Sequence, residues 1–238
     1  MMIKRLKRQK CVALLMDPDN YAPGDAINIE GIASPYRPDY IFIGGSLTSV
    51  HPDEIIMKVK EQTDIPVVLF PGSLLQLSSK ADILLLLSLI SGRNPDLLIG
   101  NHVVAAPHIK NMDIEIIPTG YILINCGAKT SVEYMSQTDA IPAAKIDIAV
   151  ATAMAGEMLG LKLIYLEGGS GATHPVPGAM IRAVSAALDI PLVVGGGLRS
   201  ADSIREAFNA GADMLVLGNG CQDDPGLLQT ACKIRDGL

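Results

Sequence analysis

Short runs of apolar residues recur along the whole chain, and most of them end in glycine, proline or a polar residue. The runs are continuous and do not alternate with polar residues, which is typical of strands that are buried on both faces of a parallel sheet. The eight runs cover 11–19, 40–46, 66–72, 82–91, 114–125, 162–169, 191–197 and 213–219. We therefore expect eight buried parallel strands.

Helical patterns lie between most of these runs. Apolar residues recur in them at helical spacing, and several segments begin with proline or serine or end in glycine, which are common at helix ends. The expected helices cover 53–63, 94–110, 142–160, 177–188, 200–211 and 224–237. The segment 73–81, between the third and fourth strands, is too short and too rich in serine for a full helix, so we expect irregular chain there.

The alternation of strand and helix predicts an α/β fold, namely a (β/α)8 TIM barrel whose third helix is replaced by irregular chain. The length of 238 residues suits a single barrel domain over 1–238. An open, doubly wound parallel sheet is the main structural alternative.

Composition narrows the class of protein. Hydrophobic residues make up 49% of the chain and charged residues 18%, which is typical of a folded globular protein. The net charge of −6 provides no overall basic field for nucleic acid. Basic residues gather at the start, in KRLKRQK (4–10), which fits either a solvated helix face or contact with anionic lipid headgroups.

The cysteines and the apolar runs favour a cytoplasmic protein. The four cysteines show no C-x-x-C spacing, so we expect reduced thiols. The apolar run after the basic start breaks at residues 17–19, which is unlike a signal peptide. The longest apolar stretch, 83–90, is far shorter than a membrane span requires.

In a barrel of this kind the active site lies at the carboxyl ends of the strands. The last three runs end there in bare backbone, with GGSG at 168–171, GGG at 195–197 and GNG at 218–220. Backbone N–H groups without side chains in the way can surround one anion, and the N-termini of the following helices favour negative charge. These turns predict a phosphate site; the alternative is that they are only tight turns between strand and helix.

Glu167 ends the sixth run, directly before the first glycine turn. A carboxylate at this position can reach a hydroxyl of a small phosphorylated molecule and act as a general base. Tyr165 lies two residues earlier, so its side chain points to the same face of the strand. The alternatives are an ion pair for Glu167 and ordinary core packing for Tyr165.

Asp17 follows the apolar residues of the first run, and Ser46 is the last residue of the second run. One carboxylate with a hydroxyl resembles a sparse Mg²⁺ site, in which the ion keeps most of its waters and also contacts a substrate phosphate. A helix cap or a turn is the alternative role for Asp17. The histidines have no metal-ligand spacing, and we expect His102 and His108 on the surface or in packing contacts.

Five motifs at strand ends resemble one known family. MDPD (16–19), FIGGS (42–46), YLEGGSGA (165–172), VGGGLRS (194–200) and LGN (217–219) resemble, in this order, motifs of the geranylgeranylglyceryl phosphate synthases and the related bacterial heptaprenylglyceryl phosphate synthases. The resemblance runs from about residue 14 to the end of the chain. It implies a Mg²⁺-dependent prenyltransferase that joins sn-glycerol 1-phosphate to a polyprenyl diphosphate, expected to be the geranylgeranyl compound, through an ether bond.

The resemblance also implies roles for individual residues and a homo-oligomer. Asp17 and Ser46 would bind Mg²⁺, and Glu167 would accept the proton of the attacking hydroxyl, with Tyr165 beside it as the second catalytic residue. Because the chain has no tryptophan and three phenylalanines, the prenyl groove is expected to be mostly aliphatic, within 67–100 and around Tyr121. The residues expected to bind glycerol phosphate are Tyr165, Leu166, Glu167, Gly168, Gly169, Ser170, Gly171, Gly196, Gly197, Gly218 and Asn219.

Two positions depart from the family. Leu15 stands where some bacterial relatives have lysine, so that contact to glycerol phosphate is absent or is made elsewhere. Ser46 stands where threonine is the alternative in relatives, and it keeps the hydroxyl. Two other hypotheses stay open, a different phosphate-binding barrel enzyme and a phosphate-binding barrel without catalysis. A different barrel enzyme would explain the glycines but not the combination of Asp17, Ser46 and Glu167.

Overall fold

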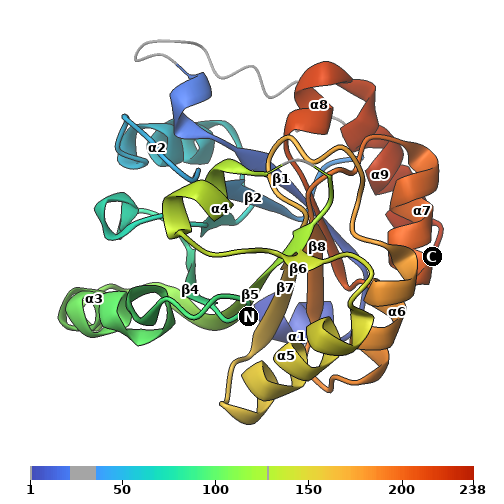
Figure 1. Ribbon diagram of the computed structural model, residues 1–238. Helices are drawn as coiled ribbons and strands as arrows, with labels where there is room; N and C mark the ends of the chain where they lie inside the picture. Colours follow the sequence, from blue (N-terminus) through green and yellow to red (C-terminus); the bar gives the residue numbers. More distant parts are fainter. Residues whose placement is uncertain (1, 22–35, 128) are drawn as a thin grey trace.

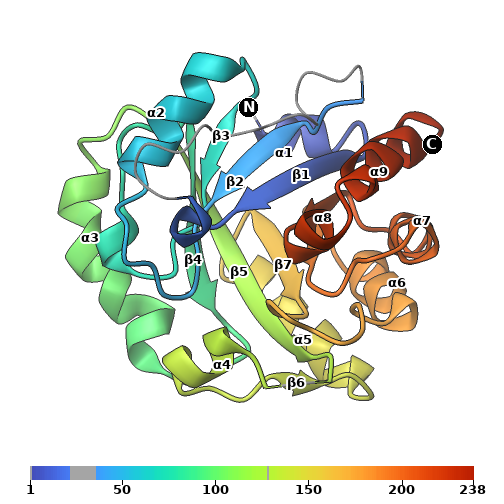
Figure 2. The same cartoon turned by 90° about the horizontal axis from the view of Figure 1, so that it is seen from above.

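Eight parallel strands close into a barrel, which Figure 2 shows from above. The computed structural model describes residues 2–21, 36–127 and 129–238. The strands are β1 (Cys11–Met16), β2 (Tyr40–Ile43), β3 (Val67–Leu69), β4 (Ile83–Leu89), β5 (Glu115–Asn125), β7 (Leu163–Glu167), β8 (Leu192–Gly195) and β9 (Met214–Leu217). Each pairs in parallel with its neighbours, and the β9–β1 pairing closes the ring. All eight predicted strands are confirmed, and an open sheet is excluded.

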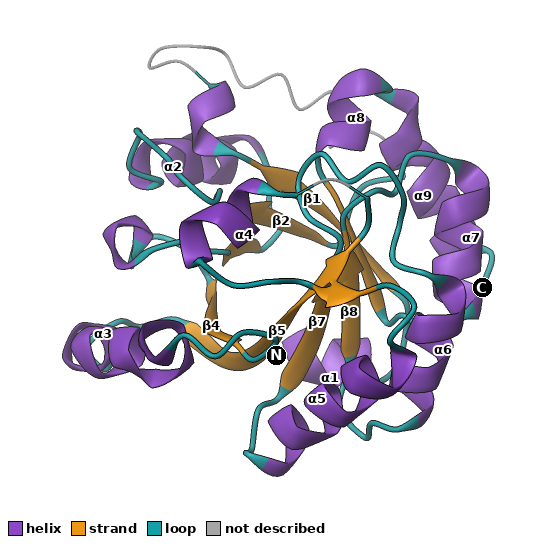
Figure 3. Cartoon of the chain, in the orientation of Figure 1, coloured by secondary structure: helices purple, strands orange, loops and turns teal. Residues whose placement is uncertain are grey.

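Helices surround this barrel, as Figures 1 and 3 show. They are α2 (Asp53–Gln62), α3 (Asn101–Ile109) with the π-helical turn η3 (Asp96–Gly100) before it, α5 (Ile146–Met158), α6 (Gly178–Ala186), α7 (Ala201–Asn209) and α9 (Gly226–Asp236). The predicted helix 142–160 begins late, because the short strand β6 (Ile141–Pro142) extends along the end of β5. Two short helices that the sequence did not predict, α4 (Ser131–Ser136) and α8 (Asn219–Asp223), follow β5 and β9.

The third helix is absent, as predicted. Between β3 and β4 the chain forms only the 3-10 turn η2 (Leu74–Gln76). The buried side chain of Gln76 fixes this segment, because its amide donates to the Gly45 carbonyl at 2.9 Å and its oxygen accepts from the Gly72 N–H at 3.0 Å. The side of the barrel between α2 and α3 therefore lacks a packed helix.

Side chains from alternate strand positions fill the barrel. Phe42 and Tyr165 point inward, whereas Leu166 points outward and packs in the cluster beneath the helices. At the other end of the barrel, the short helix α1 (Met2–Leu6) buries Met2 and Leu6 in the inner cluster.

The basic start of the chain is thus partly structural. Arg5 forms an ion pair with the buried Asp39, and Lys10 pairs with Asp213 at 3.2 Å, whereas Lys4 and Lys7 are exposed. Contact with anionic lipid stays a prediction. Among the helices that the structure describes, no segment has both the length and the apolar character of a membrane span.

Candidate active site

A cavity of about 660 Å³ opens at the carboxyl ends of the strands. This volume lies within the range of small-molecule binding sites. One part of the cavity is lined by the glycine-rich turns and by Asp17, Ser46 and Glu167. The other part runs toward η2, β4 and α3 and is mostly aliphatic. The cavity therefore combines a polar end with an apolar groove.

The three glycine-rich turns converge at the polar end. The Gly168 N–H donates to the Gly195 carbonyl at 2.9 Å, which joins the turns after β7 and β8. The Asn219 amide donates to the Ser170 hydroxyl at 3.1 Å, which joins the turns after β9 and β7. Gly196 has φ of 84°, and a Cβ there would lie 2.6 Å from the Glu167 Oε1. Because only glycine fits at this approach, the backbone can surround a small anion, as the sequence predicts.

Glu167 lies at the centre of this arrangement and is only 6% exposed. Its Oε1 accepts a hydrogen bond of 2.6 Å from the Gly169 N–H. Among the described residues no lysine or arginine forms an ion pair with it, so the ion-pair alternative is not supported. Burial raises the pKa of Glu167, while the hydrogen bond from the Gly169 N–H opposes the rise. The carboxyl group is thus poised to take up a proton.

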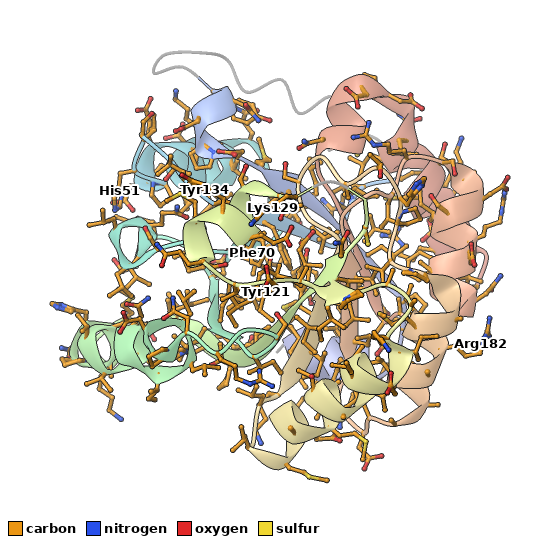
Figure 4. All side chains as sticks on the ribbon, viewed as in Figure 1. His51, Phe70, Tyr121, Lys129, Tyr134 and Arg182 are labelled. Carbon is orange, nitrogen blue, oxygen red and sulfur yellow. The ribbon has the colours of Figure 1, made fainter. Side chains whose placement is uncertain are left out.

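Four aromatic rings form the floor beneath Glu167. Phe70 stacks on Tyr165 with ring centres 5.3 Å apart, and Tyr121 meets both rings edge-on at 5.7 and 5.4 Å. Phe42 lies 6.0 Å from Phe70, deeper in the barrel. Figure 4 shows Phe70 and Tyr121 together in the centre of the molecule. The packing fixes the direction in which both tyrosine hydroxyls point.

Tyr165 and Tyr121 both present a hydroxyl in the barrel. Burial raises the pKa of both tyrosines well above the usual value, so both stay protonated and can donate. The Tyr165 hydroxyl is buried and has no hydrogen-bond partner among the described residues. An unsatisfied buried hydroxyl is costly, so a polar group of a ligand would stabilise it.

Asp17 and Asp19 have separate roles. Asp19 accepts hydrogen bonds from the Ser49 and Val50 N–H groups and holds the loop after β2. Asp17 accepts from the Asp19 N–H at 3.1 Å, and its other oxygen faces Gly45, where a Cβ would lie only 2.7 Å away. Asp17 is therefore both a turn residue and part of the cavity wall.

The donors around Asp17 fit Mg²⁺. Asp17 and Ser46 both line the cavity, and burial raises the pKa of Asp17. In the described part of the chain no cluster of three or more histidine, cysteine, aspartate or glutamate side chains is suited to a metal. One carboxylate and one hydroxyl beside an open cavity match an ion that keeps its waters and binds a substrate phosphate. They do not match a structural zinc or calcium site.

The apolar groove receives residues that the sequence analysis did not assign to it. His102 was expected on the surface or in packing, but it lines the groove, and its Nε2 lies 3.0 Å from the Ser88 hydroxyl. The reason is the absent third helix, which leaves the inner side of α3 facing the cavity. The remaining groove residues include Leu74, Leu77, Leu86, Leu97, Val132 and Met135.

Most of the predicted site residues meet in this one cavity. Leu166 does not line it, because strand alternation turns its side chain outward, and Gly168 contributes to the turn without lining the cavity. The residues that line it as predicted are Asp17, Ser46, Tyr165, Glu167, Gly169, Ser170, Gly171, Gly196, Gly197, Gly218 and Asn219.

The family is settled by comparison with known proteins. The model of the PcrB family matches residues 4–234, which is nearly the whole chain. The chain belongs to the PcrB family. The predicted family resemblance is confirmed, because curated relatives in this group are named geranylgeranylglyceryl phosphate synthase. The relative from Spirosoma linguale is 47% identical, over 98% of this chain and 94% of its own length. The relative from Chitinophaga pinensis is also 47% identical, over 95% and 90%.

Solved structures agree with this family. The geranylgeranylglyceryl phosphate synthase of Thermoplasma acidophilum, in complex with its substrate sn-glycerol-1-phosphate, has a TM-score of 0.91 and 31% identity. The alignment covers all of this PcrB-family chain and 97% of the Thermoplasma chain. The barrel of this chain therefore has the same fold as that solved structure.

The unsatisfied hydroxyl of Tyr165 makes a prediction for stability in this PcrB-family member. Tyr165→Phe should leave the free energy of unfolding unchanged or raise it by about 1 kcal/mol, because it removes a buried donor without a partner. Urea denaturation of the wild type and Tyr165→Phe without ligand measures the difference. A loss of about 1 kcal/mol in Tyr165→Phe would contradict the assignment of its hydroxyl as unsatisfied.

Proposed function

We propose that this protein joins sn-glycerol 1-phosphate to a polyprenyl diphosphate and forms an ether bond. The glycine-rich turns suit the phosphate of the acceptor, and the aliphatic groove suits the chain of the donor. The names of the relatives favour the geranylgeranyl compound as donor. The observation that carries the proposal is a single cavity in which the buried carboxylate of Glu167 lies between a phosphate cradle and an apolar groove.

The proposed reaction is a substitution at C1 of the prenyl chain. The free hydroxyl oxygen of glycerol phosphate forms the new C–O bond, and the bond between C1 and the diphosphate oxygen breaks. The electron pair of that bond leaves with diphosphate. Glu167 accepts the hydroxyl proton, which its raised pKa favours. The Tyr165 hydroxyl donates a hydrogen bond to an oxygen of glycerol phosphate and so fixes the position of the attacking hydroxyl.

Mg²⁺ belongs to the proposal because its expected ligands are present. Asp17 and Ser46 would hold it, and the bound ion would neutralise charge on the leaving diphosphate. In this proposal the glycerol hydroxyl, held at the polar end of the cavity, is the nucleophile that attacks the allylic carbon. Self-association, a cytoplasmic location and contact with a membrane surface stay predictions.

Glu167→Gln tests the general base. Turnover should fall by about 10²–10⁴-fold while the fold remains, because the amide keeps the shape of the side chain but cannot take up the proton. The measurement is formation of prenylglyceryl phosphate, with circular dichroism as the check of folding. A variant that kept wild-type turnover would remove Glu167 from the mechanism.

The raised pKa of Glu167 predicts how the wild type and Glu167→Gln respond to pH. The acidic limb of the wild-type rate should lie above the 4.5 of an ordinary glutamate, because Glu167 must be ionised to act.

The free energy of unfolding, in contrast to the rate, should fall as the pH rises. Below 4.5 the carboxyl is neutral in both folded and unfolded states, and as pH rises the unfolded state loses its proton first. The wild type should thus lose stability relative to Glu167→Gln as pH increases through the folded pKa. Melting temperatures of both proteins against pH measure this difference.

Asp17→Asn tests the proposed metal ligand. The Mg²⁺ concentration for half-maximal rate should rise by about tenfold or more, because an amide oxygen is a weaker ligand than a carboxylate. Asp19→Asn is the control. It should lower the melting temperature through the loop after β2 while leaving the Mg²⁺ dependence unchanged. An unchanged Mg²⁺ dependence in Asp17→Asn would exclude Asp17 as a ligand.

A further inference from the structure

The charges that line the cavity are unbalanced for the substrates proposed above. Both substrates are polyanions, and the cavity wall itself carries the carboxylates of Asp17 and Glu167. Among the described residues, Arg199 is the only lysine or arginine that lines the cavity. It lies two residues after Gly197, at the rim of the glycine-rich turns. Neutralisation by protein side chains therefore depends on Arg199.

Arg199 forms an ion pair with α8. Its Nη1 donates to Asp223 Oδ2 at 2.9 Å. Asp223 lies four residues after Asn219, which itself binds the Ser170 hydroxyl. The guanidinium is thereby tied to the same short helix that carries part of the phosphate cradle. The ion pair thus links the segment after β8, which carries Arg199, to the helix after β9.

The ion pair is exposed, with 49% of the Arg199 side chain and 66% of the Asp223 side chain accessible to solvent. Water solvates both groups, so the pair contributes little to folding. A guanidinium can exchange such a carboxylate for a phosphate, which offers two charges and a matching geometry for two parallel N–H donors. Exposure is what permits the exchange.

Other sources of positive charge are weaker candidates. Gly218 in the cradle faces the aliphatic side chain of Leu15, whose Cδ2 would lie 3.6 Å from a Cβ at Gly218. The side of the cradle formed by Leu15 therefore supplies no positive charge for a phosphate. Lys129, labelled in Figure 4, belongs to the loop before α4 and does not line the cavity.

We infer that Arg199 binds the phosphate of glycerol phosphate and that Asp223 competes with the phosphate for the guanidinium. In the free protein Asp223 holds Arg199 at the rim. When glycerol phosphate enters the cradle, Arg199 exchanges Asp223 for the phosphate oxygens. The inference rests on the proposed function, because it takes glycerol phosphate as the ligand.

The test compares Arg199→Gln with Asp223→Asn in the binding of sn-glycerol 1-phosphate, by calorimetry without any prenyl donor. Arg199→Gln should raise the Kd by about tenfold or more, since it removes a charged hydrogen bond. Asp223→Asn should lower the Kd by about two- to fivefold, because it removes the competitor. If the Arg199–Asp223 ion pair served only to stabilise the local structure, both variants would bind glycerol phosphate more weakly. That result, or an unchanged Kd in Arg199→Gln, would overturn the inference.

Two further variants serve as controls. Arg205→Gln removes an exposed arginine from α7 that pairs with Asp202 at 3.4 Å, and its Kd should equal that of the wild type. Lys129→Gln should also leave the Kd nearly unchanged. If this variant alone bound glycerol phosphate more weakly, Lys129 and not Arg199 would be the side chain that binds the phosphate. The wild-type Kd should rise with salt more steeply than that of Arg199→Gln, because one phosphate contact by a charged side chain is absent in the variant.

Binding and turnover separate the inference from the proposed function. If wild-type protein forms no ether product but the two variants shift the Kd in opposite directions, the inference holds and the proposed reaction is wrong. If the product forms but the two variants shift the Kd in the same direction, the reaction stands and the role of Arg199 is wrong. Wild-type protein that binds no glycerol phosphate would overturn the inference.

Discussion

The architecture of the site depends on one buried carboxylate, Glu167, which pairs with no lysine or arginine in the part of the chain that the structure describes. Glu167 is almost inaccessible, and desolvation raises its pKa. The hydrogen bond from the Gly169 N–H offsets part of that cost. The bare backbone of the turn after β8 makes room for the carboxylate, since a side chain at Gly196 would collide with it. A charged group is kept in this position only by surroundings built for it, which is why the glycines and the aromatic floor belong to the same unit.

The missing third helix is the second feature on which the shape of the cavity depends. A barrel normally packs a helix over each strand, and the irregular segment around η2 leaves that layer open beside β4. The leucines of β4 and the inner side of α3 then border a groove that continues from the polar end. Polar chemistry and an apolar chain can share one cavity because these two features are adjacent, and Gln76 holds the irregular segment in place.

The sequence predicts the strands well because a buried parallel strand is a continuous apolar run with a clear end. It also predicts the facing of Tyr165 and Glu167, which follows from strand alternation, and the same rule would have turned Leu166 away from the cavity. The position of His102 was harder to predict. Its side chain faces the groove because the helix between β3 and β4 is missing, and that helix lies outside the segment that carries His102. The role proposed for Arg199 could not be predicted either, because it depends on which charged side chains line the folded cavity, and among the described residues no other lysine or arginine does.

The central claim is that this cavity forms an ether between glycerol phosphate and a prenyl chain. The most direct measurement incubates the protein with Mg²⁺, labelled sn-glycerol 1-phosphate and a series of polyprenyl diphosphates of increasing length, followed by extraction into organic solvent. We expect a labelled product in the organic phase and an optimum at the geranylgeranyl compound. The absence of product with every donor, from folded protein that still binds glycerol phosphate, would contradict the claim.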